Sequence, residues 1–378
     1  MINEIEEILE MRRTAPPEAM EQAISGLSGK PVVLYGAGAF GAENFALLSR
    51  YGVIPAAFLD KNAQPGAEKL GIPVYHPDSE NLSGSFRKEC SVYISITAPA
   101  RVMASIKSDL SNWGYENCKE VQSITARQVC YDDDDRENPG DDYMQTNKEK
   151  IIRALDLMAD EESRKTYVSC VKAHLLREYC CVYETGFPEQ YFDAGVPLKK
   201  GLSSFIDCGA YNGDSLIGAL RHCGTIDNFI AFEPIVTNFI ELSDAVAQRR
   251  DVVKSAFLYP CGVAERTGTA RFNVAASASA ITENDSGEVL PLVRLDDVIF
   301  NVPVTFIKMD IEGAELSALR GAERLISEQS PDMAISVYHC VNHFWDIPYY
   351  ISRLSSRYSF YLRAHTAATL ESVLYCCE

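Results

Sequence analysis

Two glycine-rich turns, each lying between an apolar run and a helical pattern, constrain the fold of this chain more than any other feature. The first, GAGAFG at 36–41, follows the apolar run at 32–35. The second lies within FIDCGAYNGDS at 205–215. Such turns connect a strand to the helix that crosses over to the next parallel strand. We therefore predict an α/β chain with two Rossmann-like domains.

An acidic segment without apolar residues separates the two units. Residues 132–142 read DDDDRENPGDD, where like charges repel one another and the Pro-Gly pair breaks regular structure. The ligand spacing of a calcium loop is absent, so a solvated linker is the favoured interpretation. We predict a Rossmann-like N-terminal domain over 1–130, an acidic linker over 131–146, and a helical lead-in plus a second α/β domain over 147–378.

Apolar periodicity and breaking residues predict the elements of each unit. In the first unit we expect strands over 32–35, 56–60 and 92–96 and helices over 2–12, 17–27, 42–51 and 101–113. The second unit is expected to begin with helices within 147–182 and to continue with strands over 204–208, 228–233, 255–261, 304–310, 333–338, 358–363 and 371–376. Because no long helix separates the last two strands, the sheet is expected to end in an antiparallel pair.

The composition of the chain argues against nucleic-acid and membrane partners. Lys and Arg number 35 against 53 Asp and Glu, giving a net charge of −18 that repels phosphate backbones, so no nucleic-acid partner is expected. No apolar run approaches the ~20 residues of a membrane span, and the acidic N-terminus lacks a signal-peptide core. We expect a cytoplasmic protein without a membrane partner, with a homo-oligomer left open. The 12 cysteines lack zinc spacing and are interpreted as reduced, buried thiols rather than disulfides or metal ligands.

The first turn has the spacing of a dinucleotide-binding loop. Gly36 allows the tight turn, Gly38 lets the backbone approach a phosphate, and Gly41 lets helix and strand pack closely. Asp60 follows the next apolar run, where an acidic residue would meet a ribose hydroxyl. Nothing in 61–130 forms a recognisable hydride-transfer site, so a Rossmann-shaped domain that binds no dinucleotide is an equally open interpretation.

The second turn has a different pattern, D-x-G-x-x-x-G-D-S. Asp207 ends the strand itself, and a carboxylate there would repel a pyrophosphate but suits a ligand with an amino group, such as the methionine part of S-adenosylmethionine. Glu233 ends the next strand, where an acceptor can bind both hydroxyls of an adenosine ribose. Two acidic strand ends beside a glycine turn favour an adenosyl ligand.

A third polar group follows the strand within 304–315, VTFIKMDIEGAE. Side chains alternate along a strand, so Lys308, Asp310 and Glu312 would share one side. Such residues at the end of a buried strand are costly without a partner or a ligand, and α/β sheets bind ligands at the carboxyl ends of their strands. We expect them to face the same site as the acidic residues of the second turn. Glu315 would lie in the first turn of a helix, where the helix dipole also favours an anion, so its role stays open.

His339 ends a further strand, on the same edge of the sheet. Histidine can accept a proton near neutral pH, although a structural hydrogen bond is an equally good interpretation. His343 is interpreted as structural. Asp310 and His339 are the candidate proton acceptors, with Lys308 or Glu312 orienting. A divalent cation on Asp310 and Glu312 is the alternative, but no metal is expected because no further ligands cluster there.

The quoted motifs resemble the FkbM-type family of S-adenosylmethionine-dependent methyltransferases over about 183–376. FIDCGAYNGDS, FEP and FIKMDIEGAELSALRGA carry the resemblance, and KMDIEGAE is its most specific part. The resemblance implies a class I methyltransferase sheet with an antiparallel last strand, S-adenosyl-L-methionine as cofactor, and O-methylation of a hydroxyl on a sugar or small natural product. The N-terminal half resembles, more loosely, the Rossmann-like domain that often precedes such modules.

The resemblance implies that the residues of the second glycine turn lie around the methionine end of the cofactor, that Glu233 binds its ribose, and that Asp310 and Glu312 border the transfer site. Together with the arguments from the residues above, this gives the predicted site. Catalytic roles go to Asp310, His339, Glu312 and Lys308. The cofactor-binding residues are Gln190, Tyr191, Asp207, Gly209, Ala210, Tyr211, Gly213, Asp214, Ser215, Glu233, Pro234, Asn238, Gly262 and Asp310. Acceptor recognition is expected from loops such as 183–200 and 273–288.

Two other functions stay in view. One is a non-catalytic, regulatory protein with two nucleotide-binding lobes; the acidic cluster at 308–315 argues against it, because a sensor needs no base. The other is an NAD-dependent oxidoreductase that uses the first turn; the acidic residues that end the strands of the second unit argue against that.

Overall fold

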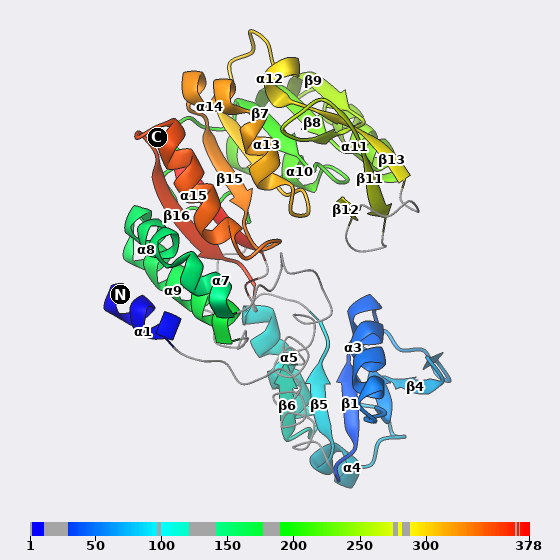
Figure 1. Cartoon of the computed structure of the whole chain (residues 1–378). Helices are drawn as coiled ribbons and strands as arrows, with labels where there is room; N and C mark the ends of the chain where they lie inside the picture. Colours follow the sequence, from blue (N-terminus) through cyan, green and yellow to red (C-terminus); the bar gives the residue numbers. More distant parts are fainter. Residues whose placement is uncertain are drawn as a thin grey trace.

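The computed structural model describes residues 2–10, 29–96, 100–120, 141–176, 190–274, 279–281, 288–366, 369 and 371–378. They form a six-stranded sheet in the N-terminal half, and a seven-stranded sheet with a small four-stranded sheet in the C-terminal half (Figure 1). The prediction of an α/β fold is therefore confirmed. None of the helices in these ranges is long and apolar enough to cross a membrane.

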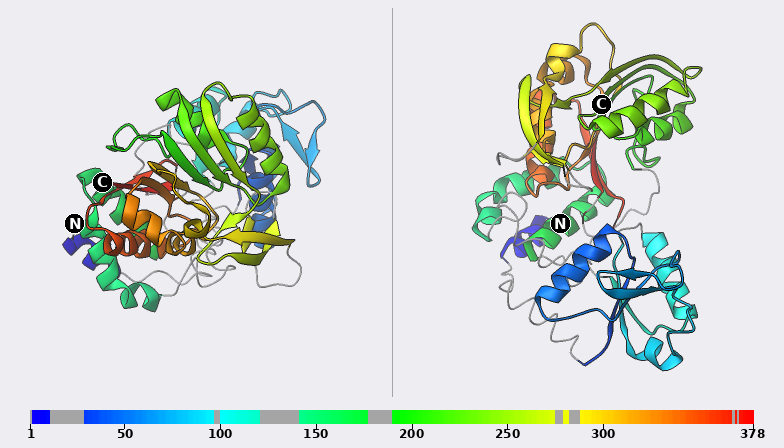
Figure 2. Two further views of the ribbon diagram at one scale, coloured as in Figure 1. Left: turned by 90° about the horizontal axis from the view of Figure 1, so that it is seen from above. Right: turned by 90° about the vertical axis from the view of Figure 1, so that its right-hand side faces the viewer.

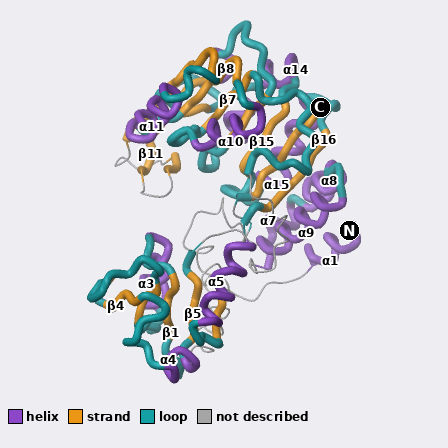
Figure 3. The backbone as a smooth tube through the Cα atoms, turned by 180° about the vertical axis from the view of Figure 1, so that it is seen from behind, coloured by secondary structure: helices purple, strands orange, loops and turns teal. Residues whose placement is uncertain are grey.

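The N-terminal sheet is centred on β1 (Val32–Tyr35), which is buried on both faces. Val33 and Tyr35 contribute to one apolar cluster, and Val32 and Leu34 to another, as expected for a strand whose side chains alternate between two covered faces. Figure 3 shows α3 (Ala39–Arg50) and α5 (Ala100–Asn112) on opposite sides of this sheet.

The strand order of this sheet is β3-β4-β2-β1-β5-β6. β1 pairs in parallel with β2 (Ala57–Leu59) and with β5 (Ser91–Ile94), close to the expected strands. Helix α3 begins at Ala39, before the expected residue 42, because the glycine turn leads directly into it. The elements that the sequence did not indicate are short: β3 (Glu68–Lys69), β4 (Ile72–Tyr75), α4 (Gly84–Glu89) and β6 (Asn117–Glu120).

The first helix, α1 (Ile2–Glu10), packs with the C-terminal half rather than with this sheet. Its apolar residues Ile5, Ile8 and Leu9 are buried in the same core cluster as α8 (Lys148–Leu157) and α9 (Glu161–Leu176). Figure 1 shows α1 beside these helices. The structure thus differs from the expectation that residues 1–130 belong to one N-terminal domain, because an apolar helix face packs where a matching apolar surface lies.

The C-terminal end of the expected linker is helical. Asp141–Thr146 form α7, and Met144 on that helix is buried. The acidic run before it, 131–140, lies outside the described residues, as does the expected helix at 17–27. The expected helices within 147–182 are found as α8 and α9. Residues 177–182 lie outside the described residues.

The large sheet has the order β16-β17-β15-β14-β7-β8-β9. Strands β7, β8, β9, β14 and β15 are parallel, while β17 is antiparallel to both β15 and β16, so the predicted antiparallel end of the sheet is confirmed. Its strands are β7 (Ser204–Cys208), β8 (Ile226–Phe232), β9 (Val253–Tyr259), β14 (Phe306–Met309), β15 (Asp332–Ser336), β16 (Ser359–Ala364) and β17 (Ser372–Cys377).

Helices cover both faces of this sheet. One face carries α10 (Asp214–Cys223) and α11 (Val236–Ala247), and the other carries α13 (Glu315–Arg320), α14 (Glu323–Gln329) and α15 (His343–Leu354), as Figure 2 shows. Two separate apolar clusters lie between the sheet and these layers. Cys208 and Cys261 are buried there, as expected for these two thiols.

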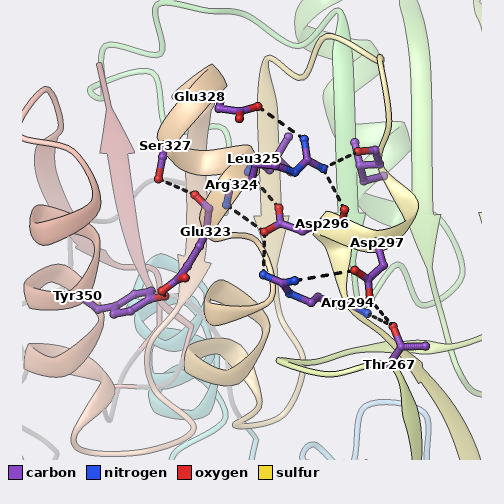
Figure 4. A network of polar contacts seen from close by, with 11 residues as sticks. Thr267, Arg294, Asp296, Asp297, Glu323, Arg324, Leu325, Ser327, Glu328 and Tyr350 are labelled. Atoms are coloured by element: carbon purple, nitrogen blue, oxygen red, sulfur yellow. Dashed lines mark hydrogen bonds and ion pairs between the residues drawn. The ribbon is translucent and has the colours of Figure 1, made fainter.

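A small sheet of order β10-β13-β11-β12 was not expected. Its strands are β10 (Gly262–Val263), β11 (Gly268–Val274), β12 (Ser279–Ile281) and β13 (Glu288–Val293), so part of the expected acceptor loop 273–288 is strand. The buried residue Asp296, in α12 (Leu295–Val298) directly after this small sheet, connects the sheet to helix α14 (Figure 4). Its carboxylate accepts hydrogen bonds from the backbone N–H groups of Arg324 at 2.9 Å and Leu325 at 3.0 Å, at the start of α14 where orphan N–H groups need acceptors.

Candidate active site

The carboxyl ends of β7, β8, β14 and β15 gather most of the polar residues that the sequence singled out. The turn after β7 depends on glycine for a packing reason. Gly209 has φ +82°, and a Cβ on it would collide with the backbone carbonyl of Asp310. Gly213, with φ +87°, leads into α10 at the left-handed conformation that glycine adopts at low cost. The two glycines therefore bring β7, β14 and α10 close together.

Asp207 lies beneath this turn and is fully buried. One carboxylate oxygen lies 3.2 Å from Nζ of Lys308, and the other accepts a hydrogen bond from the hydroxyl of Ser215. Burial raises the pKa of Asp207, against the opposing effects of Lys308 and Ser215. Because Asp207 is fully buried and has partners inside the chain, a ligand amino group could reach it only if the atoms that cover it moved.

Lys308 is held behind the turn and does not reach the open side of the site. Only 4% of it is exposed, its ammonium donates to the carbonyl of Gly209 at 2.5 Å, and it lies 5.2 Å from the ring centre of Tyr191. Burial opposes its charge, but Asp207 and Asp310 outweigh this, so the pKa of Lys308 is raised. Lys308 thus neutralises a buried carboxylate and fastens the turn to β14, while the orienting role expected for it stays a prediction.

Glu233 ends β8 beside the same turn. Its carboxylate accepts hydrogen bonds from the N–H groups of Tyr211 and Ile235, each at 2.9 Å, and from the side chain of Asn238 at 3.4 Å. Burial raises the pKa of Glu233, while these three donors lower it. Pro234 and Asn238 are half-buried next to it.

The remaining expected cofactor residues have simpler surroundings. Ala210 is buried, whereas Tyr211 is 53% exposed with φ +45°. Asp214 accepts a hydrogen bond from the N–H of Ser215 at 2.9 Å. Gly262 pairs with Leu292 in the small sheet.

Asp310 follows β14 and is held by two tyrosines. The hydroxyl of Tyr191 donates to one carboxylate oxygen at 2.5 Å, and that of Tyr338 lies 3.4 Å from the other. Burial raises the pKa of both phenols, so they remain donors. The side chain of Asp310 is still 23% exposed. This arrangement fixes a carboxylate while leaving it accessible.

His339 lies between three carboxylates. Its Nδ1 is 2.8 Å from Glu315, and its Nε2 is 3.4 Å from both Asp310 and Glu312. Burial opposes the charge of the ring, but Glu315 and then Asp310 and Glu312 outweigh it and raise the pKa of His339 to about 9. The ring is therefore protonated at neutral pH, which argues against its expected role as a proton acceptor.

Glu312 and Glu315 differ in their surroundings. Glu312 has φ +55°, a conformation that is strained for a residue with a side chain, and it is 39% exposed. Glu315 is fully buried and also faces His343, whose Nδ1 lies 3.3 Å away. Although burial raises the pKa of Glu315, His339 and His343 outweigh that effect and lower it. The expected structural role of His343 agrees with this pairing.

One group of potential metal ligands occurs in the described part of the chain. It comprises Asp310, Glu315 and His339, with one ligand atom from each lying within 4.8 Å of the others. It includes Glu315 rather than Glu312, which the sequence had suggested as the partner of Asp310. Because Oε1 of Glu315 already accepts from His339 and from the N–H of Ile311 at 3.0 Å, this donor set is largely in use.

Three residues near Asp310 were not assigned from the sequence, or were left open. Tyr338 contacts Asp310 directly, and Glu315 contacts His339. Glu371 is close enough for Asp310 to add to the effect of burial in raising its pKa. Tyr338 precedes His339 and Glu315 lies within KMDIEGAE, so proximity to a motif was the available signal for both. Gln190, half-buried before Tyr191, lies at the same side of the site through its hydrogen bond to Glu371.

Residues 207–360 match the family model described as the methyltransferase FkbM domain. This segment is a methyltransferase FkbM domain. The match begins at Asp207 and includes Glu233, Asp310 and His339, so all four acidic or basic strand ends discussed above belong to it. The match supports methyltransferase activity for this segment.

A solved structure supports the fold of the whole chain. The crystal structure of methyltransferase FkbM from Methylobacillus flagellatus KT is similar with a TM-score of 0.67 and 24% identity, covering 95% of this chain and 93% of that one. The N-terminal domain of human METTL16 in complex with SAH covers 63% of this chain and 94% of that one, at 10% identity. Its TM-score of 0.26 is too low to support an argument. No curated protein matches this chain.

Proposed function

We propose that this FkbM domain transfers a methyl group from S-adenosylmethionine to a hydroxyl group of a small acceptor, such as a sugar or a natural product. The observation that carries the proposal is Asp310, a carboxylate held by two tyrosine hydroxyls yet partly exposed at the carboxyl end of the sheet. It lies one strand away from the glycine turn after β7, beside which α/β sheets bind their ligands.

The chemistry of the donor set fits an adenosyl cofactor. Glu233 directly follows β8, and within the described residues only the N–H of Tyr211 donates to its Oε2, so a lone pair remains for a ribose hydroxyl. The carboxylates of Asp207, Glu233, Asp310 and Glu312 outnumber the cations Lys308 and His339 at this edge. Such an excess attracts a sulfonium cation and repels a pyrophosphate.

When bound, S-adenosylmethionine would supply a methyl group that needs no activation by the protein. The chain's task is to align the acceptor with it, and orientation of this kind can contribute ~7–11 kcal/mol. Asp310 can accept the proton of the acceptor hydroxyl or orient that hydroxyl, because Tyr191 and Tyr338 fix its carboxylate. The charge excess also favours an acceptor without phosphate groups.

Calorimetry and a transfer assay on the full chain test the proposal. We expect binding of S-adenosylmethionine, and transfer of its labelled methyl group to at least one member of a panel of sugars and glycosylated metabolites. Asp310→Asn keeps the size of the side chain but removes its basicity, so turnover should fall ~10²-fold or more while cofactor affinity changes little.

Glu328→Gln is the matched control, because this carboxylate lies on α14 and is 63% exposed. It should leave turnover unchanged. The absence of cofactor binding would refute the proposal, and unchanged turnover in Asp310→Asn would refute the role of that residue. Cofactor binding without transfer to any acceptor would favour a non-catalytic function instead.

A further inference from the structure

We propose that Glu315 is a positioning residue for this methyl transfer: it holds the ring of His339 so that the other ring nitrogen faces Asp310 and Glu312 together. The inference rests on the proposed function, because it assigns a role within the same site. Glu315 lies in the first turn of α13, where the helix dipole alone could account for an acidic residue.

Glu315 is joined to the loop that carries the two exposed carboxylates. Its Oε1 accepts hydrogen bonds from the backbone N–H groups of Ile311 at 3.0 Å and Gly313 at 3.4 Å, the residues on either side of Glu312. An ordinary helix-capping carboxylate needs no further partner. Here the same oxygen also lies 2.8 Å from Nδ1 of His339, in the segment that follows the neighbouring strand β15. Glu315 therefore connects the loop after β14 with the segment after β15.

The contact at Nδ1 determines where Nε2 lies. With one nitrogen bound to Glu315, the opposite edge of the imidazole faces outward, and Nε2 is 3.4 Å from Asp310 and 3.4 Å from Glu312. A buried carboxylate that orients a histidine through its second nitrogen is a common arrangement at functional sites. Glu315 thus holds the ring at Nδ1, and the edge that carries Nε2 lies between the carboxylates of Asp310 and Glu312.

The positive charge of the ring offsets the repulsion between the carboxylates of Asp310 and Glu312. The groups that face His339 are Glu315 of α13, the carboxylates of Asp310 and Glu312 in the loop after β14, and Tyr338, whose ring centre lies 4.2 Å away. From α15, His343 faces the same Glu315. With the pKa of His339 at about 9, a positive charge stays between Asp310 and Glu312 through the neutral range. Two carboxylates that flank one ring would otherwise repel each other, and Asp310 would lose the neighbour that helps to hold it in place.

The experiment compares Glu315→Gln with the wild-type full chain. The variant keeps the shape of the side chain but removes the charge that holds the imidazolium. We expect kcat to fall about tenfold or more while the KM for S-adenosylmethionine changes little. Activity that needs the imidazolium falls as pH rises through the pKa of His339, about 9, so this high-pH limb should shift toward the unperturbed value near 6.5 in the variant.

Glu323→Gln is the matched control, because Glu323 occupies the first turn of the next helix, α14, and contacts Tyr350 instead of a histidine. It should leave the pH profile unchanged. Because Glu315→Gln could fail to fold, His339 is also titrated by NMR in the wild-type chain, with His339→Gln identifying its signal. That titration needs no acceptor, so it separates this inference from the proposed methyl transfer.

A titration midpoint well above 6.5 supports the inference, whether or not an acceptor is found. A midpoint near 6.5, or an unchanged pH profile in Glu315→Gln, would overturn it. Loss of activity with a chelator, restored by Mg²⁺ or Mn²⁺, would also overturn it, because His339 would then be a metal ligand rather than a positioned cation.

Discussion

The two glycine turns share one polar contact, but they differ in the residues beneath the turn and in those that follow the neighbouring strand. In the N-terminal sheet, Asp60 after β2 accepts a hydrogen bond from the N–H of Ala37 at 3.2 Å. In the C-terminal sheet, Glu233 after β8 accepts one from the N–H of Tyr211 at 2.9 Å. An acidic residue that ends the second strand and bonds to the turn after the first is thus common to both sheets, and it does not by itself indicate the chemistry.

The difference lies under the turn and on the next strand. The second turn rests on the buried pair of Asp207 and Lys308, and its neighbour β14 continues into Asp310 and Glu312. The strand in the matching position of the first sheet, β5, continues into Ser95 and Ile96. We therefore expect the chemistry to come from the strands beside the turn, because within the described residues only the second unit has two carboxylates after the strand next to its glycine turn.

The largest difference should appear when the lysine of each turn is replaced. Lys308→Met leaves the carboxylate of Asp207 buried without its cation, which typically costs ~3–5 kcal/mol of stability. Lys69, near the first turn, donates to the carbonyls of Ala37 and Gly38 and has no carboxylate partner among the described residues, so Lys69→Met should cost less than about 1 kcal/mol. Urea denaturation followed by circular dichroism measures both. The double variant Asp207→Asn/Lys308→Met should recover part of the loss, and no recovery would contradict the pairing.

Adding one methyl group to each turn should sharpen the comparison. A Cβ on Gly209 would meet the carbonyl of Asp310 at a φ of +82°, so Gly209→Ala should lose at least about 2 kcal/mol. A Cβ on Gly38 would meet nothing within 4 Å, so Gly38→Ala should be tolerated. Thermal denaturation of the two variants tests this. Equal losses would mean that close packing does not distinguish these two positions.

Replacing the acidic residue that the turns share tests whether only one of them serves the methyl donor. Glu233→Ala removes at least one charge-assisted hydrogen bond, worth ~1.5–3 kcal/mol, so affinity for S-adenosylmethionine should fall about 10- to 100-fold. Asp60→Ala makes the same change at the first turn and should leave that affinity unchanged. Isothermal calorimetry on the two full-length variants gives the answer, and an unaltered affinity in Glu233→Ala would remove Glu233 from the cofactor site.

The smallest effect is expected from Gly38→Val, which fills the open space at the first turn. Binding of S-adenosylmethionine should be unchanged, because we regard the N-terminal sheet as ancillary to methyl-donor binding. A thermal-shift screen with NAD, NADP and nucleotide sugars accompanies this variant. Strong stabilisation by NAD that Gly38→Val abolishes would break the comparison, because the first turn would then have a ligand of its own.

Much of the fold could be predicted from the sequence, because strands and turns leave local patterns. The apolar run before the second turn became β7, and the last two runs became the antiparallel β16 and β17. The short strands and the small sheet left too little periodicity to be recognised, with β10 spanning only Gly262–Val263. Helix α1 was recognised as a helix, but its partners lie more than a hundred residues away in the chain, and no local pattern indicates them.

The site divides in the same way. The sequence by itself indicated that Asp207, Glu233 and Asp310 lie at the carboxyl ends of strands of one α/β sheet, because apolar runs and glycine turns are local and parallel strands end at one edge. His339 lies three residues beyond its strand, because β15 already ends at Ser336. Only the tertiary structure decided what each of them does. Burial between β7 and β14 pairs Lys308 with Asp207 behind the glycine turn, and three carboxylates around His339 keep its ring protonated. Such properties depend on distance and desolvation between segments far apart in the chain, which the order of residues does not reveal.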